Sequence, residues 1–230
     1  VLDAIGEYFV PTFSLAVFAQ LISLVIAVPM GILAAYKRGT SVDIITVSIS
    51  LLGIAIPGFL LSMFLMLFFG VHLKWLPVAG YVQLSRGLLE HLRYLLLPAL
   101  SLGVVQAAYI TRMSRSAMLD VLYMNYIRTA RAKGLRESAV VLVYGLKNAG
   151  PTILTVAGQS FGSLVTGTIV TETLFNIPGL GMLTMTSITR RDVFVIQGVV
   201  LFVTLIYVLV NLAVDILYGF VDPRIQLGNK

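Results

Sequence analysis

Five long stretches of this sequence carry no charged residue, and they restrict the possible folds more than any other feature. They cover residues 8–36, 44–73, 94–111, 148–171 and 193–214. An α-helix needs roughly 20 apolar residues to cross the hydrocarbon core of a bilayer. The third stretch is the shortest, and we expect its helix to extend through Arg112. Because lipid offers no hydrogen-bond partners, each stretch must satisfy its own backbone as a helix.

The composition agrees with a membrane protein. Hydrophobic residues make up 58% of the chain and charged residues 11%, whereas a soluble domain has about 25% charged residues. A membrane β-barrel would need short alternating segments, which are absent from the sequence. The chain has no cysteine, which excludes disulfides and thiolate chemistry. We predict an all-α, polytopic transmembrane helical bundle with five spans, forming a single transmembrane domain over residues 1–230.

The distribution of basic residues predicts the orientation. One side of the predicted membrane holds Lys37, Arg38, Arg112, Arg115, Arg128, Arg131, Lys133, Arg136, Lys147, Arg224 and Lys230, and the other holds Lys74, Arg86, Arg93, Arg190 and Arg191. Cytoplasmic loops carry an excess of Lys and Arg. We therefore expect the C-terminus in the cytoplasm and the first residue, Val1, outside. This pattern accounts for the net charge of +6, so we do not expect nucleic-acid binding.

The start of the chain contains no signal-peptide pattern that would deliver an outside N-terminus. The simplest expectation is that at least one further span precedes Val1. The alternative is a natural protein with its N-terminus outside.

Two of the spans have internal features. The second carries Pro57 and Gly58 near its middle, which predicts a kink, either for packing or as part of a moving gate. The fourth carries a pair of glycines, Gly158 and Gly162, that permits close helix approach. It also places uncharged polar residues on one helical face, at Thr152, Thr155, Gln159, Ser163 and Thr166. This stripe is either the lining of a solute pathway or a set of interhelical hydrogen-bonding groups.

The basic segment 112–147 between the third and fourth spans predicts a short cytoplasmic helix over residues 126–133. Asn125 is suited to cap its start, and Gly134 to end it. Ala130 and Gly134 offer a small-residue surface for a closely approaching body. A helix this short is not stable alone in water, so it must dock onto this protein or onto a partner. The alternative is a basic loop that only sets the topology.

The residues of this helix resemble the EAA loop, the coupling helix of ABC importer permeases, in its dipeptide, oligopeptide and nickel form. Arg128 and Thr129 depart from the general pattern of that loop, as do Tyr144 and Lys147. Segments 112–119, 171–181 and 211–224 resemble the same subfamily, so the likeness covers nearly the whole chain. The residues of the resembling helix are Tyr126, Ile127, Arg128, Thr129, Ala130, Arg131, Ala132, Lys133, Gly134 and Leu135.

The resemblance implies a type I ABC importer permease fold in a bacterial inner membrane. It implies a solute pathway for peptides, nickel or metal chelates, delivered by an external binding protein. The implied partners are a second homologous permease subunit and two cytoplasmic ATPases that dock on the coupling helix. No Walker-type glycine loop occurs in this sequence, so ATP and Mg²⁺ would bind those ATPases and no cofactor is expected here. Six spans are usual in the family, in agreement with a span upstream of Val1.

Features typical of a hydrolase, a metal site or a secondary transporter are weak in this sequence. The segment 158–162 matches the G-x-S-x-G pattern of hydrolases, but it lies within a predicted membrane helix. His72 and His91 are the only histidines, and their spacing defines no metal site. A secondary transporter or channel would more often carry carboxylates inside its spans. Glu172 and Asp215 lie at span edges instead, where we expect them to anchor loops.

Overall fold

The computed structural model describes residues 1–221, and every regular element in that part of the chain is a helix. The predicted all-α fold is confirmed. Four helices are long and apolar enough to cross a membrane, and a bent helix pair makes a fifth crossing if it counts as one span. The predicted cytoplasmic C-terminus, with Arg224 and Lys230, lies outside the described residues.

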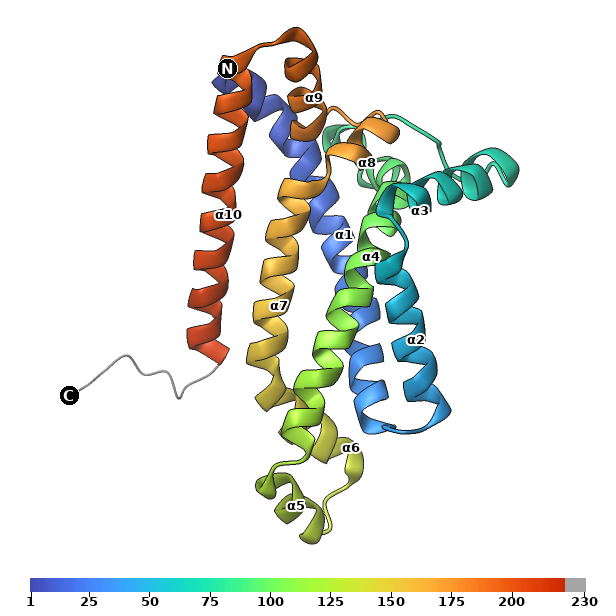
Figure 1. Ribbon diagram of the computed structural model, residues 1–230, viewed down its shortest axis with the longest axis vertical. Coiled ribbons are helices and arrows are strands. Elements are labelled where there is room, and N and C mark those ends of the chain that lie inside the picture. Colours follow the sequence, from blue (N-terminus) through green and yellow to red (C-terminus); the bar gives the residue numbers. More distant parts are fainter. Residues whose placement is uncertain (222–230) are drawn as a thin grey trace, which may run out of the picture.

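Three long helices form the centre of the bundle: α1 (Leu2–Tyr36), α4 (Leu88–Leu122) and α7 (Leu146–Gly167) (Figure 1). Helices α1 and α4 approach closely because small residues line their contact. A Cβ atom at Gly103 would lie 2.8 Å from the carbonyl oxygen of Ala19, and one at Gly31 would lie 2.7 Å from Cβ of Ser114. In lipid, such close packing replaces the hydrophobic drive that holds helices together in water.

Helix α10 (Val193–Val221) runs beside α7 at the edge of the bundle (Figure 1). The glycine pair of α7 faces it, as the spacing predicts. Gly158 is in contact with Val214, and a Cβ atom at Gly162 would lie 2.8 Å from Cδ2 of Tyr207. Most apolar side chains of α10 are exposed in the described chain, as expected for a helix that borders lipid.

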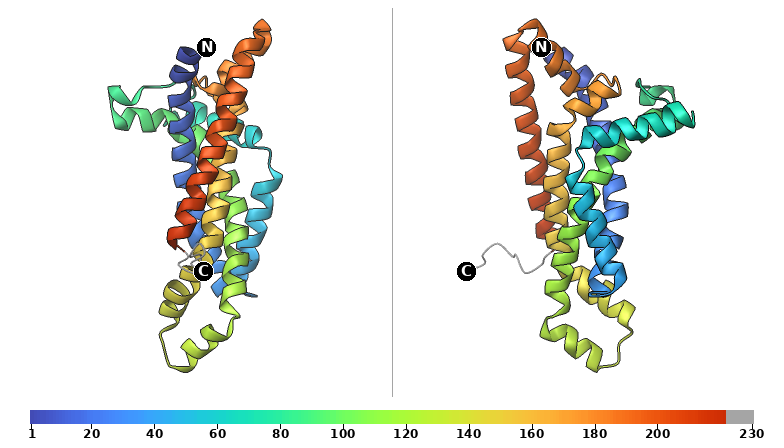
Figure 2. Two further views of the ribbon diagram at one scale, coloured as in Figure 1. Left: turned by 90° about the vertical axis from the view of Figure 1, so that its left-hand side faces the viewer. Right: turned by 45° about the vertical axis from the view of Figure 1, so that its right-hand side comes forward.

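The second charge-free stretch differs from its expected form. It is divided into α2 (Ser41–Ala55), α3 (Gly58–Leu65) and the π-helical segment η1 (Met66–His72). The chain bends by 97° between α2 and the continuous part formed by α3 and η1. The break falls at Pro57, where a kink was expected. Ile56 adopts an extended backbone with ψ of 122°, because the residue before proline is disfavoured in the helical region. Figure 1 and the right-hand view of Figure 2 show α3 leaving the bundle sideways.

The remaining elements gather at the two ends of the bundle. The "α5 end" holds α5 (Asn125–Ala132), α6 (Glu137–Ala139) and η3 (Val140–Gly145). The "α9 end" holds η2 (Leu84–Arg86), α8 (Ile169–Leu174) and α9 (Leu180–Arg190) (Figure 1). The basic residues of segment 128–136 and of the α1–α2 turn lie at the α5 end, so the fold separates the described cations as the sequence predicts.

Candidate solute path and docking helix

The polar stripe on α7 lies on the outside of this bundle. Thr152, Gln159, Ser163 and Thr166 are exposed and Thr155 is half-buried, whereas Val156 and Gly158 on the same helix are buried. At about 1.5 Å of rise per residue, the stripe from residue 152 to residue 166 is about 21 Å long. A row of polar side chains therefore follows α7 over most of its length without being covered by the described part of this chain.

The described hydrogen bonds of this stripe stay within α7. Thr155 Oγ1 donates to the carbonyl oxygen of Pro151 over 3.1 Å, and Thr166 Oγ1 donates to that of Ser163, also over 3.1 Å. Threonine hydroxyls satisfied in this way do not hold neighbouring helices together. The geometry thus gives no support to interhelical bonding within this subunit as the role of the stripe.

A separate polar cluster does connect the helices of the bundle. Gln20 Nε2 of α1 donates to the carbonyl oxygen of Ala157 over 3.2 Å, and Gln106 Nε2 of α4 donates to that of Ser160 over 3.4 Å. Ser160 Oγ itself lies 3.4 Å from Gln20 Oε1 and is buried in the middle of α7. Its surroundings are those of a packing residue, since a G-x-S-x-G nucleophile needs a strand-to-helix turn and a base.

Helix α5 has one buried face and one exposed face. Ile127 is fully buried and Ala130 is 5% exposed. Both pack into a cluster with the ends of α1, α4 and η3, where Ala35, Met118 and Val140 lie. The short helix is therefore stabilised by docking on its own chain. Ala130 belongs to this internal contact, and is not the exposed small-residue surface that its spacing suggested.

The exposed face of α5 and of the turn after it is basic. Arg128, Lys133 and Arg136 are exposed, and Arg131 forms an ion pair with Glu137 of α6 over 2.7 Å. The hydrogen bonds to Glu137 raise the pKa of the Arg131 guanidinium. Apolar side chains lie among the cations, with exposed fractions of 49% for Met124 and 39% for Leu135. This face combines charge with apolar area, as surfaces that dock another protein do.

The ends of α5 follow the sequence prediction in part. Gly134 has a φ of +75° and ends the helix, as expected. The N-cap position is Met124, which has an extended backbone, and Asn125 is the first helical residue. No side-chain cap bond is present at this end, so the predicted capping role of Asn125 is wrong. Ile127, in the first turn, is instead fully buried in the cluster with α1, α4 and η3.

One ion pair at the α5 end was not foreseen from the sequence. Asp43 in the first turn of α2 is 5% exposed and binds Arg115 of α4. Nearby, Arg38 Nη1 donates to the Tyr123 hydroxyl over 2.6 Å, and its guanidinium lies 5.1 Å from the centre of that ring. These contacts connect the α1–α2 turn to α4 just before α5 begins. Arg115 lies in the segment 112–119 that resembles the permease family, but its partner is 72 residues away in sequence.

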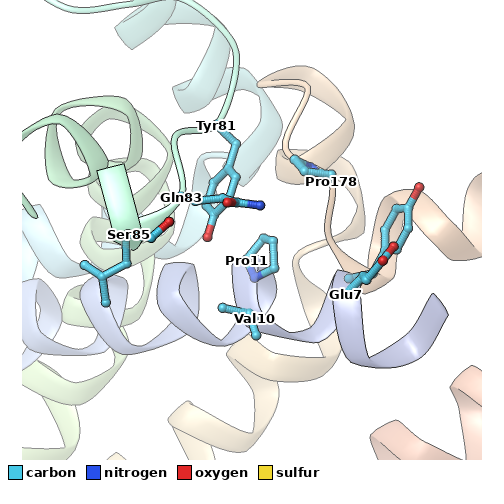
Figure 3. A pocket seen from close by; sticks show the side chains of 9 residues that line it. Glu7, Val10, Pro11, Tyr81, Gln83, Ser85 and Pro178 are labelled. Atoms are coloured by element: carbon cyan, nitrogen blue, oxygen red, sulfur yellow. The ribbon is translucent and has the colours of Figure 1, made fainter. Parts of the chain in front are cut away.

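The α9 end contains an open cleft of about 610 Å³ (Figure 3). One wall is α1, with Glu7 and Pro11, and Tyr81 and Gln83 of the segment before α4 face it across the cleft. Burial raises the pKa of the Tyr81 phenol. His91 supports this segment, because its Nδ1 lies 2.6 Å from the carbonyl oxygen of Val82 and its ring meets that of Tyr81 edge-on.

Comparison of the sequence with known proteins gives a consistent result. Residues 27–227 match the family model described as "Binding-protein-dependent transport system inner membrane component". A probable peptide ABC transporter permease protein of Sinorhizobium fredii is 40% identical over 98% of this chain and 72% of its own length. The dipeptide transport system permease protein DppB of Escherichia coli K12 is 39% identical over 96% of this chain and 74% of its own length.

Solved structures with the same fold are also known. A chain in an inward-facing structure of the MetNI methionine ABC transporter superimposes with a TM-score of 0.77 and 19% identity, covering 95% of this chain and 96% of that one. A chain in the crystal structure of an amino acid ABC transporter gives a TM-score of 0.61 with 15% identity, covering 97% of this chain and 95% of that one. At this level of identity, the likeness concerns the fold alone.

Proposed function

This chain belongs to the family of binding-protein-dependent transport system inner membrane components, and we propose that its α7 stripe lines the path of a peptide through the membrane. It is a transmembrane permease subunit of an ABC importer, with the permease fold of that class, and its family is one of transport proteins rather than enzymes. Beyond this, we propose the position of the path, the class of solute and the contacts with partner subunits.

The observation that carries the proposal is the exposure of the stripe. Uncharged polar groups in membrane helices avoid lipid and face other helices or water. Gln159 and Ser163 have no helix of the described chain over them. A second, homologous permease subunit facing α7 would enclose a polar path between the two chains. Alternating access would then open this path to each side of the membrane in turn.

The names of the relatives support a peptide as the solute. The proteins compared above are named for peptide and dipeptide transport. A stripe of hydroxyl and amide groups without a charge can hydrogen-bond a peptide backbone without selecting one side chain. Delivery and selection would then fall to an external binding protein, for which the cleft at the α9 end offers a contact surface.

The α5 end is the proposed site of energy coupling. Its excess of Lys and Arg supports a cytoplasmic position, with the α9 end and Val1 outside. The exposed face of α5, from Arg128 to Leu135, would dock one of two cytoplasmic ATPases. ATP and Mg²⁺ would bind to those ATPases, and this chain would bind no cofactor.

The test uses charge reversal at the two ends. Arg128→Glu and Lys133→Glu together should weaken ATPase binding to the full transporter in membranes, and added salt should reduce the difference from the native protein. Arg86→Glu, an exposed cation at the α9 end, is the matched control and should leave ATPase binding unchanged. Native ATPase binding and native peptide-stimulated hydrolysis in the α5 variant would refute this face as the docking site.

A further inference from the structure

Glu172 of α8 is fully buried, with 0% of its surface exposed. No ion pair to it is found among the described residues. Burying a carboxylate without a cation is costly unless hydrogen bonds replace its water. Hydrogen bonds around Glu172 must therefore offset the cost of burying its carboxylate.

Three donors from different parts of the chain converge on this carboxylate. Thr12 Oγ1 of α1 donates to Oε1 over 2.6 Å, and Thr168 Oγ1, just before α8, donates to the same oxygen over 2.7 Å. The backbone N–H of Met182, in the first turn of α9, donates to Oε2 over 3.1 Å. The positive end of the α9 helix dipole also faces the carboxylate.

Thr12 extends this network to α9 a second time. Its hydroxyl oxygen accepts a hydrogen bond from the backbone N–H of Leu180 over 2.8 Å, while its hydrogen goes to Glu172. Leu180 also packs with Ile5 of α1 and Val199 of α10. A single hydroxyl therefore joins α1 to both α8 and α9, at positions 160 and 168 residues away in sequence.

Two glycines make room for the carboxylate. Gly179 is in contact with the Glu172 carboxyl group, and a Cβ atom at Gly181 would lie 2.8 Å from its Oε2. Any side chain at either position would collide with the buried group. The segment from Thr171 to Gly181, singled out in the sequence for its family likeness, is thus built around one carboxylate.

Backbone hydrogen bonds extend the same unit toward the cleft. The N–H of Ile177 donates to the carbonyl oxygen of Glu172 over 2.9 Å, which folds the α8–α9 turn back on itself. The N–H of Gly80 donates to the carbonyl oxygen of Phe175 over 2.8 Å, which attaches the segment before α4. Together with the bond from Thr12, these bonds connect the segment around Glu172 to α1 and to the segment before α4, and residues of both line the cleft in Figure 3.

We propose that Glu172 is a positioning residue at the α9 end of the bundle. It joins α8, α9 and the adjoining part of α1 into one rigid body, which moves as a unit when the solute path opens and closes. The proposal rests on the proposed transport function, because it concerns motion during the transport cycle. Glu172 does not touch the solute in this proposal. It acts through Thr12, and the body it holds carries one wall of the cleft.

The first test measures a distance in the complete transporter. Spin labels are placed at Gly6→Cys on α1 and Thr186→Cys on α9, in a chain without native cysteine. A Cβ atom at Gly6 meets no atom within 4 Å, and Thr186 is exposed, so neither label should disturb the fold. The distance between the labels should be the same in the nucleotide-free and the vanadate-trapped transporter. A distance that changes between these states, in a transporter that still imports peptide, would overturn the rigid body.

The second test compares two variants that each remove one hydroxyl donor from the same oxygen. Thr12→Val cuts the connection between helices, whereas Thr168→Val removes a contact four residues away in the chain. Thr12→Val should broaden the α1–α9 distance and lower transport several-fold at an unchanged level in the membrane. Thr168→Val should affect both much less, and Thr12→Ser, which keeps the hydroxyl, should restore both. Equal effects of the two valine variants would show that burial of the carboxylate, rather than the connection, matters.

The two tests separate this proposal from the transport function on which it rests. If the native protein imports peptide and the label distance changes, only the rigid body fails. If the native protein with its ATPases imports no peptide, the proposed function fails. Should Thr12→Val not assemble, the label distances in the native background still decide the question.

Discussion

Arg115 of α4 donates two hydrogen bonds to Asp43 of α2, from Nε to Oδ1 over 2.6 Å and from Nη2 to Oδ2 over 2.8 Å. The same carboxylate accepts the backbone N–H of Gly39 over 2.9 Å, so it also fixes the α1–α2 turn. A paired contact of this kind has a defined geometry as well as a favourable energy. It holds the start of α2 against α4, whereas the other end of α2 stops at Ala55, just before the break at Pro57.

Loss of this ion pair should destabilise the protein. Asp43→Asn leaves Arg115 without its charged partner, and we expect a cost of about 2 kcal/mol, in the range for hydrogen bonds to charged groups. The thermal midpoint of the purified transporter in detergent or nanodiscs measures the effect. Arg112→Gln, which removes an exposed cation one turn earlier on α4, is the control and should have little effect. Additive losses for Asp43→Asn and Arg115→Gln in the double variant would argue against the pair.

The α7 stripe should matter for transport and not for assembly. Gln159→Leu combined with Ser163→Val should lower the import rate clearly, because the path loses its hydrogen-bonding groups, while the complex with its ATPases still forms. Uptake of a labelled dipeptide into proteoliposomes measures the rate. Unchanged uptake by this double variant would favour a packing role for the stripe.

A matched pair of threonines sharpens the same test. Thr166 lies on the stripe and Thr204 lies on α10, and both are exposed hydroxyls bonded to a carbonyl of their own helix, over 3.1 Å and 2.8 Å. Thr166→Val should slow uptake and Thr204→Val should not. The comparison removes any general effect of losing a hydroxyl from a membrane helix.

The contact between α7 and α10 should not tolerate larger residues at Gly158. Gly158→Leu forces its side chain into Val214, a stiff β-branched residue, and overpacking of this kind costs about 1–3 kcal/mol. Stability of the purified protein should fall accordingly. Gly167→Leu, at a site where a Cβ atom meets nothing within 4 Å, is the control. Adding Val214→Ala to Gly158→Ala should recover the stability that Gly158→Ala alone loses. Without such recovery, the direct contact would not explain the loss.

The turn after α5 should require a residue that accepts a positive φ. Gly134 has a φ of +75° in open surroundings, so a β-branched side chain there is penalised by backbone strain of about 1 kcal/mol or more. Gly134→Val should weaken ATPase association and peptide-stimulated hydrolysis, whereas Gly134→Asn should behave nearly as the native protein, since Asn tolerates this conformation. ATPase co-purification and hydrolysis assays measure both. Equal behaviour of the two variants would indicate that the turn geometry has no part in coupling.

The sequence predicted features that depend on one segment at a time. Charge-free runs locate membrane helices because a single segment meets the lipid, and the polar spacing from Thr152 to Thr166 places those residues on one face by helix geometry alone. Gly134 could be read as a helix end for the same reason. The family likeness then supplied the arrangement that periodicity alone could not.

Features that depend on contacts between distant segments were missed or misread. The partner of Arg115 is on another helix, and nothing local in the sequence identifies Asp43. Ala130 was expected to lie on a surface that contacts a partner, but it packs against its own chain. A small residue at helical spacing suits either contact, so the sequence alone does not distinguish them. The sequence also predicted a kink at Pro57, but not the angle between α2 and α3. That angle depends on the space available to α3 beside α2 and α4, which no local pattern in the sequence shows.

The break at Pro57 has a consequence for the surrounding lipid. Helix α2 has 15 residues, which rise about 22 Å, whereas the hydrocarbon core of a bilayer is about 30 Å thick. Beyond it, α3 turns away from α2 and carries exposed side chains such as Phe59 and Phe64. A helix shorter than the membrane is accommodated when the bilayer thins around it. We expect the lipid beside α2 to be locally compressed, so that transport by this protein should depend on acyl-chain length.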